Sequence, residues 1–179
     1  MLSWILYALL ATTLVAVGSV FVAIRRYRAV PMPSPEAVRR AVVRELAGYP
    51  EFRRVVDLGS GWGGMAVHIA RACPQREVEG VEASPVPHLF ARGLQLIRGG
   101  PENLSFSRRD LRSLTLQPDT IYVCYLSPGV MRDIRAQFES QAPPGTIVIS
   151  ALFGIRGWQP VRSATAGDLH RTAIFVYEP

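Results

Sequence analysis

The sequence has 179 residues, of which 49% are hydrophobic and 19% are charged. This length suits one globular domain and excludes large multidomain enzymes, and the composition excludes a disordered chain, collagen and a coiled coil. The hydrophobic excess is local, because residues 2–24 contain no charged side chain. The N-terminal stretch is therefore expected to lie in a different solvent from the rest of the chain.

The formal net charge of +6 is unevenly distributed. Three of the 20 basic residues are Arg25, Arg26 and Arg28, which leaves 17 basic against 14 acidic residues elsewhere. The remaining arginines are scattered in pairs without interleaved aromatic residues, a pattern typical of a solvated surface, so no nucleic-acid partner is expected. Cys73 and Cys124 lie far apart in apolar contexts and are predicted to be buried free thiols. No spacing predicts a metal site.

The stretch Leu2–Ile24 predicts a membrane anchor. As a helix it would be about 35 Å long, enough to cross a hydrocarbon core of about 30 Å. The positive charges follow the apolar run, which favours a retained anchor over a cleaved signal peptide. They also predict a single-pass protein whose domain faces the cytoplasm, at the inner membrane in a bacterium. We expect an anchor with a basic flank over residues 1–28 and a domain over residues 29–179.

Strands and helices are expected to alternate after the anchor. Pro31 and Pro33 predict a stiff linker, and Ser34 is expected to cap a helix that opens at Pro35 and runs to about Gly48. Alternation predicts an α/β fold with a mostly parallel sheet, helices on both faces, and ligands beyond the carboxyl ends of the strands. The expected strands are 55–58, 78–81, 104–106, 120–125 and 146–152, the expected helices are 63–72, 85–97 and 129–141, and 159–164 and 171–177 are expected to form an antiparallel pair.

A glycine-rich loop and three acids indicate a nucleoside ligand. The run Asp57–Gly64 follows the first expected strand and fits both G-x-G-x-x-G for a dinucleotide and D-x-G-x-G-x-G for a methyl-donor loop. Asp57 would repel a pyrophosphate but suits the ammonium of S-adenosylmethionine. Glu82 ends the second strand, where an acid accepts hydrogen bonds from ribose hydroxyls, and Asp110 follows the third, where it can accept from an adenine amino group. The three acids favour S-adenosylmethionine over a dinucleotide.

Over residues 31–179 the chain resembles class I S-adenosylmethionine-dependent methyltransferases. It is most similar to the small membrane-anchored protein-lysine methyltransferases that act on the ATP synthase c subunit and the adenine nucleotide translocase, and to their bacterial relatives. The resemblance rests on Val30–Ser34, Val56–Gly61, Val81–Pro85, Tyr125–Pro128 with Met131, and Phe153–Pro160. It implies a Rossmann-like sheet, cofactor contacts from Asp57, Gly59, Ser60, Gly61, Gly63, Glu82, Ala83, Asp110 and Leu111, and an acceptor side at Tyr125, Ser127 and Pro128.

The predicted reaction is in-line methyl transfer, in which the protein mainly positions and desolvates the reactants. The loop after the fourth strand should lie next to the donor methyl, with Tyr125 orienting the acceptor through its hydroxyl or ring, Ser127 doing so through a hydrogen bond, and Pro128 setting the turn. We expect the acceptor to be a lysine of a membrane protein. Two alternatives stay open: a methyltransferase for a lipid or quinone-like molecule, and a non-catalytic nucleotide-binding membrane module.

Overall fold

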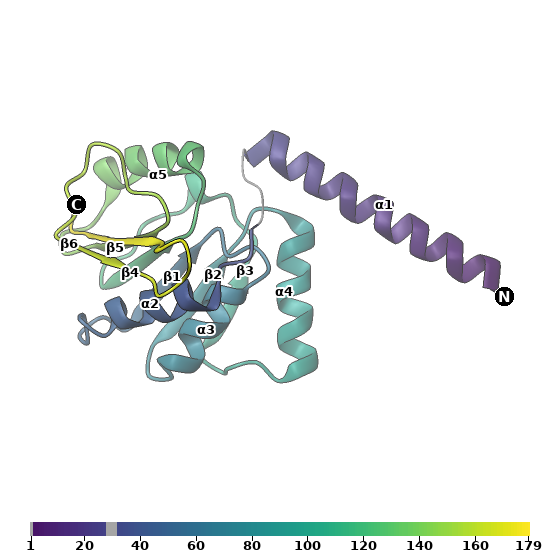
Figure 1. Ribbon diagram of the computed structural model, residues 1–179, viewed down its shortest axis with the longest axis horizontal. Coiled ribbons are helices and arrows are strands. Elements are labelled where there is room, and N and C mark those ends of the chain that lie inside the picture. The colour runs from purple at the N-terminus through teal and green to yellow at the C-terminus, as the bar shows by residue number, and fades with distance from the viewer. Residues whose placement is uncertain (1, 28–31) are drawn as a thin grey trace.

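The computed structural model describes residues 2–27 and 32–179. The boundary predicted between residues 28 and 29 and the beginning of the predicted linker lie outside these residues. Helix α1 (Leu2–Tyr27) projects from the side of a compact α/β unit (Figure 1). Among the described residues, no helix combines the length and the hydropathy needed to cross a membrane, and the span predicted over 2–24 is therefore not found.

Seven strands of the described chain form one sheet. Its order is β3-β2-β1-β4-β5-β7-β6. The first five strands are parallel, whereas β7 runs antiparallel between β5 and β6. The predicted mostly parallel sheet with an antiparallel C-terminal pair is thus confirmed. The strands are β1 (Arg54–Leu58), β2 (Glu77–Val81), β3 (Leu104–Ser107), β4 (Thr120–Cys124), β5 (Ile147–Ala151), β6 (Arg162–Thr165) and β7 (Ala173–Tyr177).

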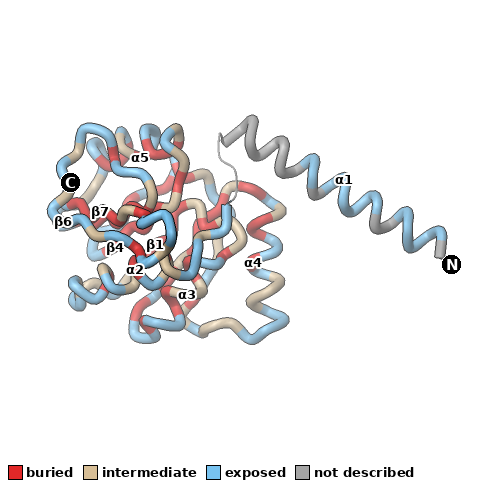
Figure 2. The backbone as a smooth tube through the Cα atoms, viewed as in Figure 1, coloured by how far each residue is buried: buried red, intermediate tan, exposed pale blue. Residues whose placement is uncertain are grey.

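Helices cover both faces of the sheet, as predicted, and two hydrophobic cores result (Figures 1 and 2). Successive strand residues point to opposite faces, so Val55 joins one core and Val56 the other. Residues of α2 and α3 pack in the core of Val55, and residues of α5 pack in the core of Val56. The helices are α2 (Glu36–Leu46), α3 (Gly64–Ala72), α4 (Pro85–Arg98) and α5 (Pro128–Gln141), with a short 3₁₀ helix η1 (Leu111–Ser113).

The start of α2 differs from the prediction. Pro35, and not Ser34, is its N-cap, because the ψ of Pro35 is an extended 151°, and this N-cap makes no side-chain hydrogen bond. The first bond of the helix runs from the Arg39 N–H to the Pro35 carbonyl at 3.1 Å. The helix after the glycine loop likewise begins one residue late, at Gly64, since Gly63 has the left-handed φ of 84°. The prediction also missed η1.

The sheet order creates a crevice at the carboxyl end of β1. From β1 the chain crosses to β2 on one side and later returns to β4 on the other. The connections on the two sides therefore diverge above β1, which is where open α/β sheets bind ligands.

Candidate active site

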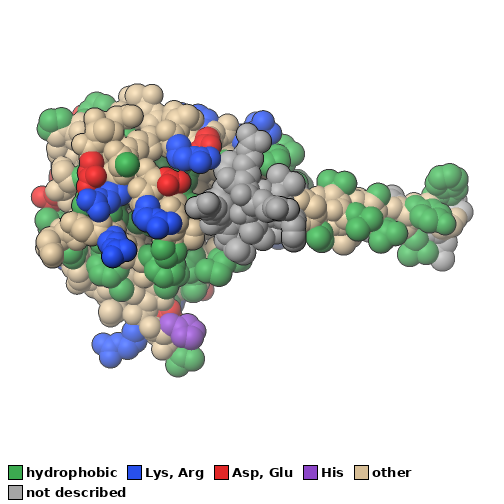
Figure 3. All heavy atoms as spheres, turned by 90° about the horizontal axis from the view of Figure 1, so that it is seen from above, with side chains coloured by type: hydrophobic (Ala, Val, Ile, Leu, Met, Phe, Trp, Pro, Cys, Tyr) green, Lys and Arg blue, Asp and Glu red, His purple; other side chains and the backbone are tan. Residues whose placement is uncertain are grey.

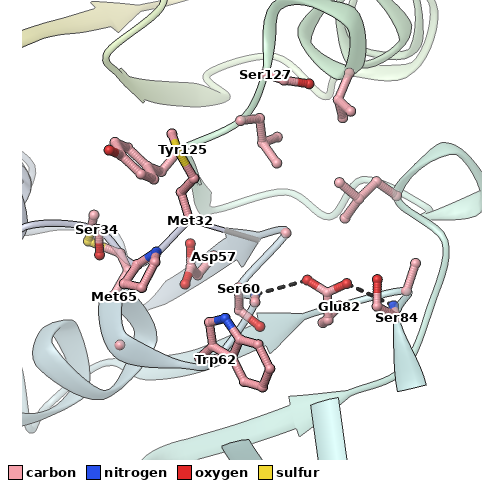
Figure 4. A pocket seen from close by; sticks show the side chains of 18 of the residues that line it. Met32, Ser34, Asp57, Ser60, Trp62, Met65, Glu82, Ser84, Tyr125 and Ser127 are labelled. Carbon is pink, nitrogen blue, oxygen red and sulfur yellow. Dashed lines mark hydrogen bonds between the residues drawn. The ribbon is translucent and has the colours of Figure 1, made fainter. Parts of the chain in front are cut away.

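A pocket occupies the crevice at the carboxyl ends of β1, β2 and β4 (Figure 4). Its walls come from the loops after these strands and from the segment that precedes α2. Gly63 and Pro128, which were predicted as site residues, do not line it: Gly63 caps α3 and Pro128 begins α5. The other ten predicted residues do line it, namely Asp57, Gly59, Ser60, Gly61, Glu82, Ala83, Asp110, Leu111, Tyr125 and Ser127.

The glycine loop after β1 is tied down by its own backbone. The amides of Gly59 and Ser60 both donate to the Val81 carbonyl, at 2.8 and 3.0 Å, so the loop is anchored to the end of β2. The φ angles of Gly59, Gly61 and Gly63 are 71°, 52° and 84°, a region that only glycine enters at low cost. Backbone rather than side chain therefore faces the pocket along this loop.

Glu82 holds the two sides of the pocket floor together. Its Oε2 accepts a hydrogen bond from the Gly61 amide at 2.9 Å, and its Oε1 accepts one from the Ser84 amide at 2.7 Å (Figure 4). The residue is 9% exposed. Hydrogen bonds from backbone amides to a carboxylate are among the stronger ones in proteins. The carboxylate is thus rigidly placed at the pocket surface.

Asp57 is the most deeply buried acid of the pocket. It is 1% exposed, and its Oδ2 has no hydrogen-bond partner. Burial raises the pKa of its carboxyl to about 7, with the Ala66 amide opposing the shift and the nearby Glu82 adding to it. A carboxyl poised near neutrality with a free oxygen is suited to a cationic group of a ligand.

We expect the stability of the ligand-free protein to depend on Asp57 between pH 4 and pH 7. The folded-state pKa of about 7 lies above the ordinary value of 3.8. The contribution of this carboxyl to the free energy of unfolding is therefore full below about pH 4 and is lost as the pH rises toward 7. Chemical denaturation at several pH values should show a smaller decline in Asp57→Asn than in the wild type. Asp119→Asn, at an exposed loop position, serves as the control. Equal slopes for Asp57→Asn and the wild type would contradict the assignment.

Asp110 lines the pocket, but its carboxylate is already engaged. Its Oδ1 accepts from the backbone amide of Arg112 at 3.0 Å, and the Arg112 guanidinium donates to both carboxylate oxygens. Asp110 is the N-cap of η1, which places Leu111 against the pocket. The first task of Asp110 is therefore to shape the loop after β3.

Tyr125 and Ser127 form the wall that follows β4. Figure 4 shows Tyr125 close to Met32, on the opposite side of the pocket from Trp62. Burial raises the pKa of the Tyr125 hydroxyl, and the negative charge of Asp168 raises it further. The hydroxyl therefore keeps its proton at neutral pH. Ser127 is the N-cap of α5 and accepts the Met131 amide through its backbone carbonyl at 3.0 Å.

Arg39 of α2 lines the pocket, whereas the paired arginines are predicted from the sequence to lie on the solvated surface. Its guanidinium lies against the start of α3: a Cβ built on Gly64 would be 2.9 Å from Nη1. Its Nε is buried and has no hydrogen-bond partner. Arg39 and Asp57 therefore bring unpaired groups of opposite sign to one pocket. The helical pattern of α2 gave no signal for this, because Arg39 and Arg40 look alike in sequence.

The segment before α2 supplies further pocket residues. Met32, Pro33 and Ser34 line the pocket although they lie far in sequence from the glycine loop. Met65 of α3 and Asp133 of α5 also line it. The proline segment belongs to the resemblance described above, whereas nothing in the sequence distinguished Met65 or Asp133.

The sheet order and the pocket together define a class of protein. A parallel sheet that ends in the β5-β7-β6 arrangement, with a glycine loop after β1 and an acid after β2, is the fold of S-adenosylmethionine-dependent methyltransferases. An RNA methyltransferase from Salinibacter ruber, solved with S-adenosyl-L-homocysteine, is similar with a TM-score of 0.70 and 29% identity, covering 82% of this chain and 92% of that one. Magnesium protoporphyrin IX methyltransferase from Synechocystis PCC 6803, solved with its methyl donor, shares the fold at a TM-score of 0.58 and 18% identity, covering 77% and 76% of the two chains.

The chain belongs to the ANTKMT methyltransferase domain family, whose model matches residues 57–162. The adenine nucleotide translocase lysine N-methyltransferase of Mus musculus is 31% identical over 108 residues, which are 60% of this chain and 47% of the mouse protein. A protein-lysine N-methyltransferase of Saccharolobus islandicus (strain REY15A) is 26% identical over 148 residues, covering 82% and 91% of the two chains. This chain thus spans about half the length of the mouse relative.

Proposed function

We propose that this chain is an S-adenosylmethionine-dependent methyltransferase that acts on a lysine side chain of a protein. The observation that carries the proposal is the buried Glu82, clamped between the Gly61 and Ser84 amides on the pocket surface. This carboxylate and the glycine loop lie inside the region that matches the family model. Two relatives that bear the name of lysine methyltransferases support the choice of acceptor.

The unpaired groups of the pocket fit S-adenosylmethionine. Asp57 Oδ2 and Arg39 Nε have no partners and would receive the α-ammonium and the α-carboxylate of its amino-acid part. Glu82 would accept hydrogen bonds from the ribose hydroxyls. Ala83, Asp110 and Leu111, on the loops after β2 and β3, would surround the adenine.

The residues of the pocket would favour methyl transfer mainly by orienting the donor and the acceptor and by excluding water from them. The donor supplies a methyl group already activated on a positively charged sulfur. Tyr125 and Ser127 would hold the acceptor amine through hydrogen bonds, and Tyr125 would do so as a neutral phenol because its pKa is raised. The amine must lose a proton before its lone pair can attack. Apolar walls at Met65 and Leu126 favour the neutral amine by disfavouring the ammonium.

Replacement of Arg39 should weaken binding of the donor selectively. Arg39→Gln is expected to raise the Kd for S-adenosylmethionine about 10-fold, because a charged hydrogen bond contributes about 1.5–3 kcal/mol. It should leave the Kd for 5′-methylthioadenosine unchanged, since that molecule lacks the amino-acid part. Isothermal titration calorimetry measures both constants. Arg40→Gln is the matched control, because Arg40 is exposed and pairs with Glu36 on the outer side of α2. An equal loss for both ligands would contradict the role of Arg39.

We further propose that α1 attaches the domain to a lipid bilayer and that the acceptor is a membrane protein. The support is the uncharged stretch 2–24, with Arg25 and Arg26 following it. Side chains on α1 such as Trp4 and Leu14 are 77% and 63% exposed, and hydrophobic side chains follow one another along α1 in Figure 3. The arginines would place the domain on the cytoplasmic side.

The acceptor can be identified by following a labelled methyl group. The purified full chain is incubated with methyl-labelled S-adenosylmethionine and with membranes or cytosol from a strain lacking its gene. Label is then counted in protein, lipid and RNA, and protein hydrolysates are tested for methyl-lysine. All 20 Lys and Arg residues of this chain are arginine, so it cannot contribute a methylated lysine side chain itself.

Methyl-lysine in protein, absent with the Glu82→Gln variant, is the expected result. Label in a lipid extract would instead support the alternative of a lipid or quinone-like acceptor. Donor binding without transfer to any fraction would support the non-catalytic module. Label confined to RNA would refute the proposed protein acceptor.

A further inference from the structure

Helix α4 exposes large apolar side chains on its outer face. Leu89, Phe90, Leu96 and Ile97 are 64%, 50%, 80% and 85% exposed, and we call these four residues the α4 outer face. Leu89 and Leu96, like Phe90 and Ile97, are seven residues apart and therefore lie on the same side of the helix. The opposite, inner side of the helix carries its buried residues, Pro87, His88 and Ala91. The outer face is thus apolar without serving the domain core.

The charges of α4 are all positive. Arg92 and Arg98 are its charged residues, both are exposed, and the helix contains no acid. A basic amphipathic helix with exposed leucine and phenylalanine is typical of binding to an anionic lipid surface. A second copy of the chain is disfavoured as the occupant, because a symmetric contact between two α4 helices would bring like-charged Arg92 side chains to one interface without a counter-charge from either helix.

The position of α4 points to the same surface. Helix α1 contacts α4 and projects from the side of the domain on which α4 lies (Figures 1 and 2). The Phe90 ring packs edge-on against Trp62 with ring centroids 5.3 Å apart, and Trp62 lines the pocket. Helix α4 therefore contacts both α1 and, through Phe90, the rim of the pocket.

We infer that α4 lies in the interface of an anionic bilayer, with its outer face in the headgroup and acyl boundary and with Arg92, which flanks that face, at lipid phosphates. The inference rests on the proposed attachment of α1 to a membrane. Its consequence is that the domain has a second contact with the bilayer, which turns the pocket rim at Trp62 toward the membrane surface. Acceptor lysines close to that surface would then be presented to the pocket.

Spin labels on the full chain test this orientation. A label is placed by Leu96→Cys, with Leu169→Cys as the matched control, because Leu169 is a 94% exposed leucine on the loop before β7. The native Cys73 and Cys124 are buried. The chain is reconstituted in vesicles of phosphatidylcholine with 30% phosphatidylglycerol, and collisions with oxygen and with a water-soluble nickel chelate are measured.

We expect nickel collisions at position 96 to fall about tenfold relative to detergent solution while oxygen collisions rise, with no change at position 169. Arg92→Gln should reverse the change at position 96. Vesicle flotation is measured on the same samples. Flotation with unchanged collisions at position 96 would overturn the role of α4 and leave the attachment through α1 intact. A chain that does not float would overturn both. Protection at position 96 that grows with protein concentration in detergent would assign the face to a second copy and refute the lipid contact.

Discussion

Glu82→Gln is expected to raise the Kd for S-adenosylmethionine about 100-fold. The carboxylate accepts hydrogen bonds from the backbone amides of Gly61 and Ser84. It would also accept hydrogen bonds from the ribose hydroxyls of the donor. A glutamine retains one acceptor oxygen and presents an N–H₂ group to an amide donor. Weakening two hydrogen bonds to a charged group costs about 3 kcal/mol of binding free energy, which corresponds to a Kd about 100-fold higher. Calorimetry on the purified chain measures the change.

Glu77→Gln is the control for that experiment. Glu77 begins the same strand, β2, but lies at its exposed end, away from the pocket. Its replacement should leave donor binding unchanged. A thermal melt of each variant separates a binding effect from unfolding. If Glu82→Gln binds the donor as tightly as the wild type while remaining folded, the assignment of the pocket fails.

Gly63→Ala is expected to lower the free energy of unfolding by about 3 kcal/mol. Its φ of 84° is unfavourable for alanine, and a Cβ there would lie 2.7 Å from Cζ of Phe106 and 3.0 Å from Cβ of Ala91. Gly145→Ala provides the matched comparison, because Gly145 has a φ of 79° but nothing within 4 Å of its built Cβ. That variant should lose only the backbone strain, about 1 kcal/mol.

Urea denaturation of both glycine variants separates the two causes. The difference between them reports the packing of the Phe106 ring against the glycine loop. Equal losses in the two variants would show that backbone strain accounts for the whole effect and that the ring yields freely. Gly63→Ala should also bind S-adenosylmethionine less tightly, because the turn that contains Gly61 is closed by the hydrogen bond from the Gly63 amide to the Ser60 carbonyl.

The glycine loop and Glu82 could be predicted because their positions follow from the order of the strands along the chain. Each follows a strand of the parallel sheet directly, and the carboxyl ends of parallel strands meet at one edge. The strand that carries a residue then determines where the residue lies. Tyr125 and Ser127 came to the pocket for the same reason, since they follow β4.

Arg39 could not be predicted, because its place depends on how α2 packs. An amphipathic helix shows which side is apolar, yet Arg39 and Arg40 both lie outside that apolar pattern. Only the packing of α2 beside α3 brings the Arg39 guanidinium over Gly64, while Arg40 pairs with Glu36 in solvent. The engagement of Asp110 by Arg112 was hidden for a similar reason, because η1 is a single turn without periodicity.

The pocket wall formed by Met32, Pro33 and Ser34 has a consequence for the search for acceptors. Met32 follows the last residue of α1, Tyr27, by five positions, and five residues reach at most about 18 Å. If α1 lies in a bilayer, this short connection would keep the pocket close to the bilayer surface. The enzyme would then meet its acceptors by lateral diffusion in two dimensions, at a high effective concentration, and lysines farther from the bilayer would be out of range.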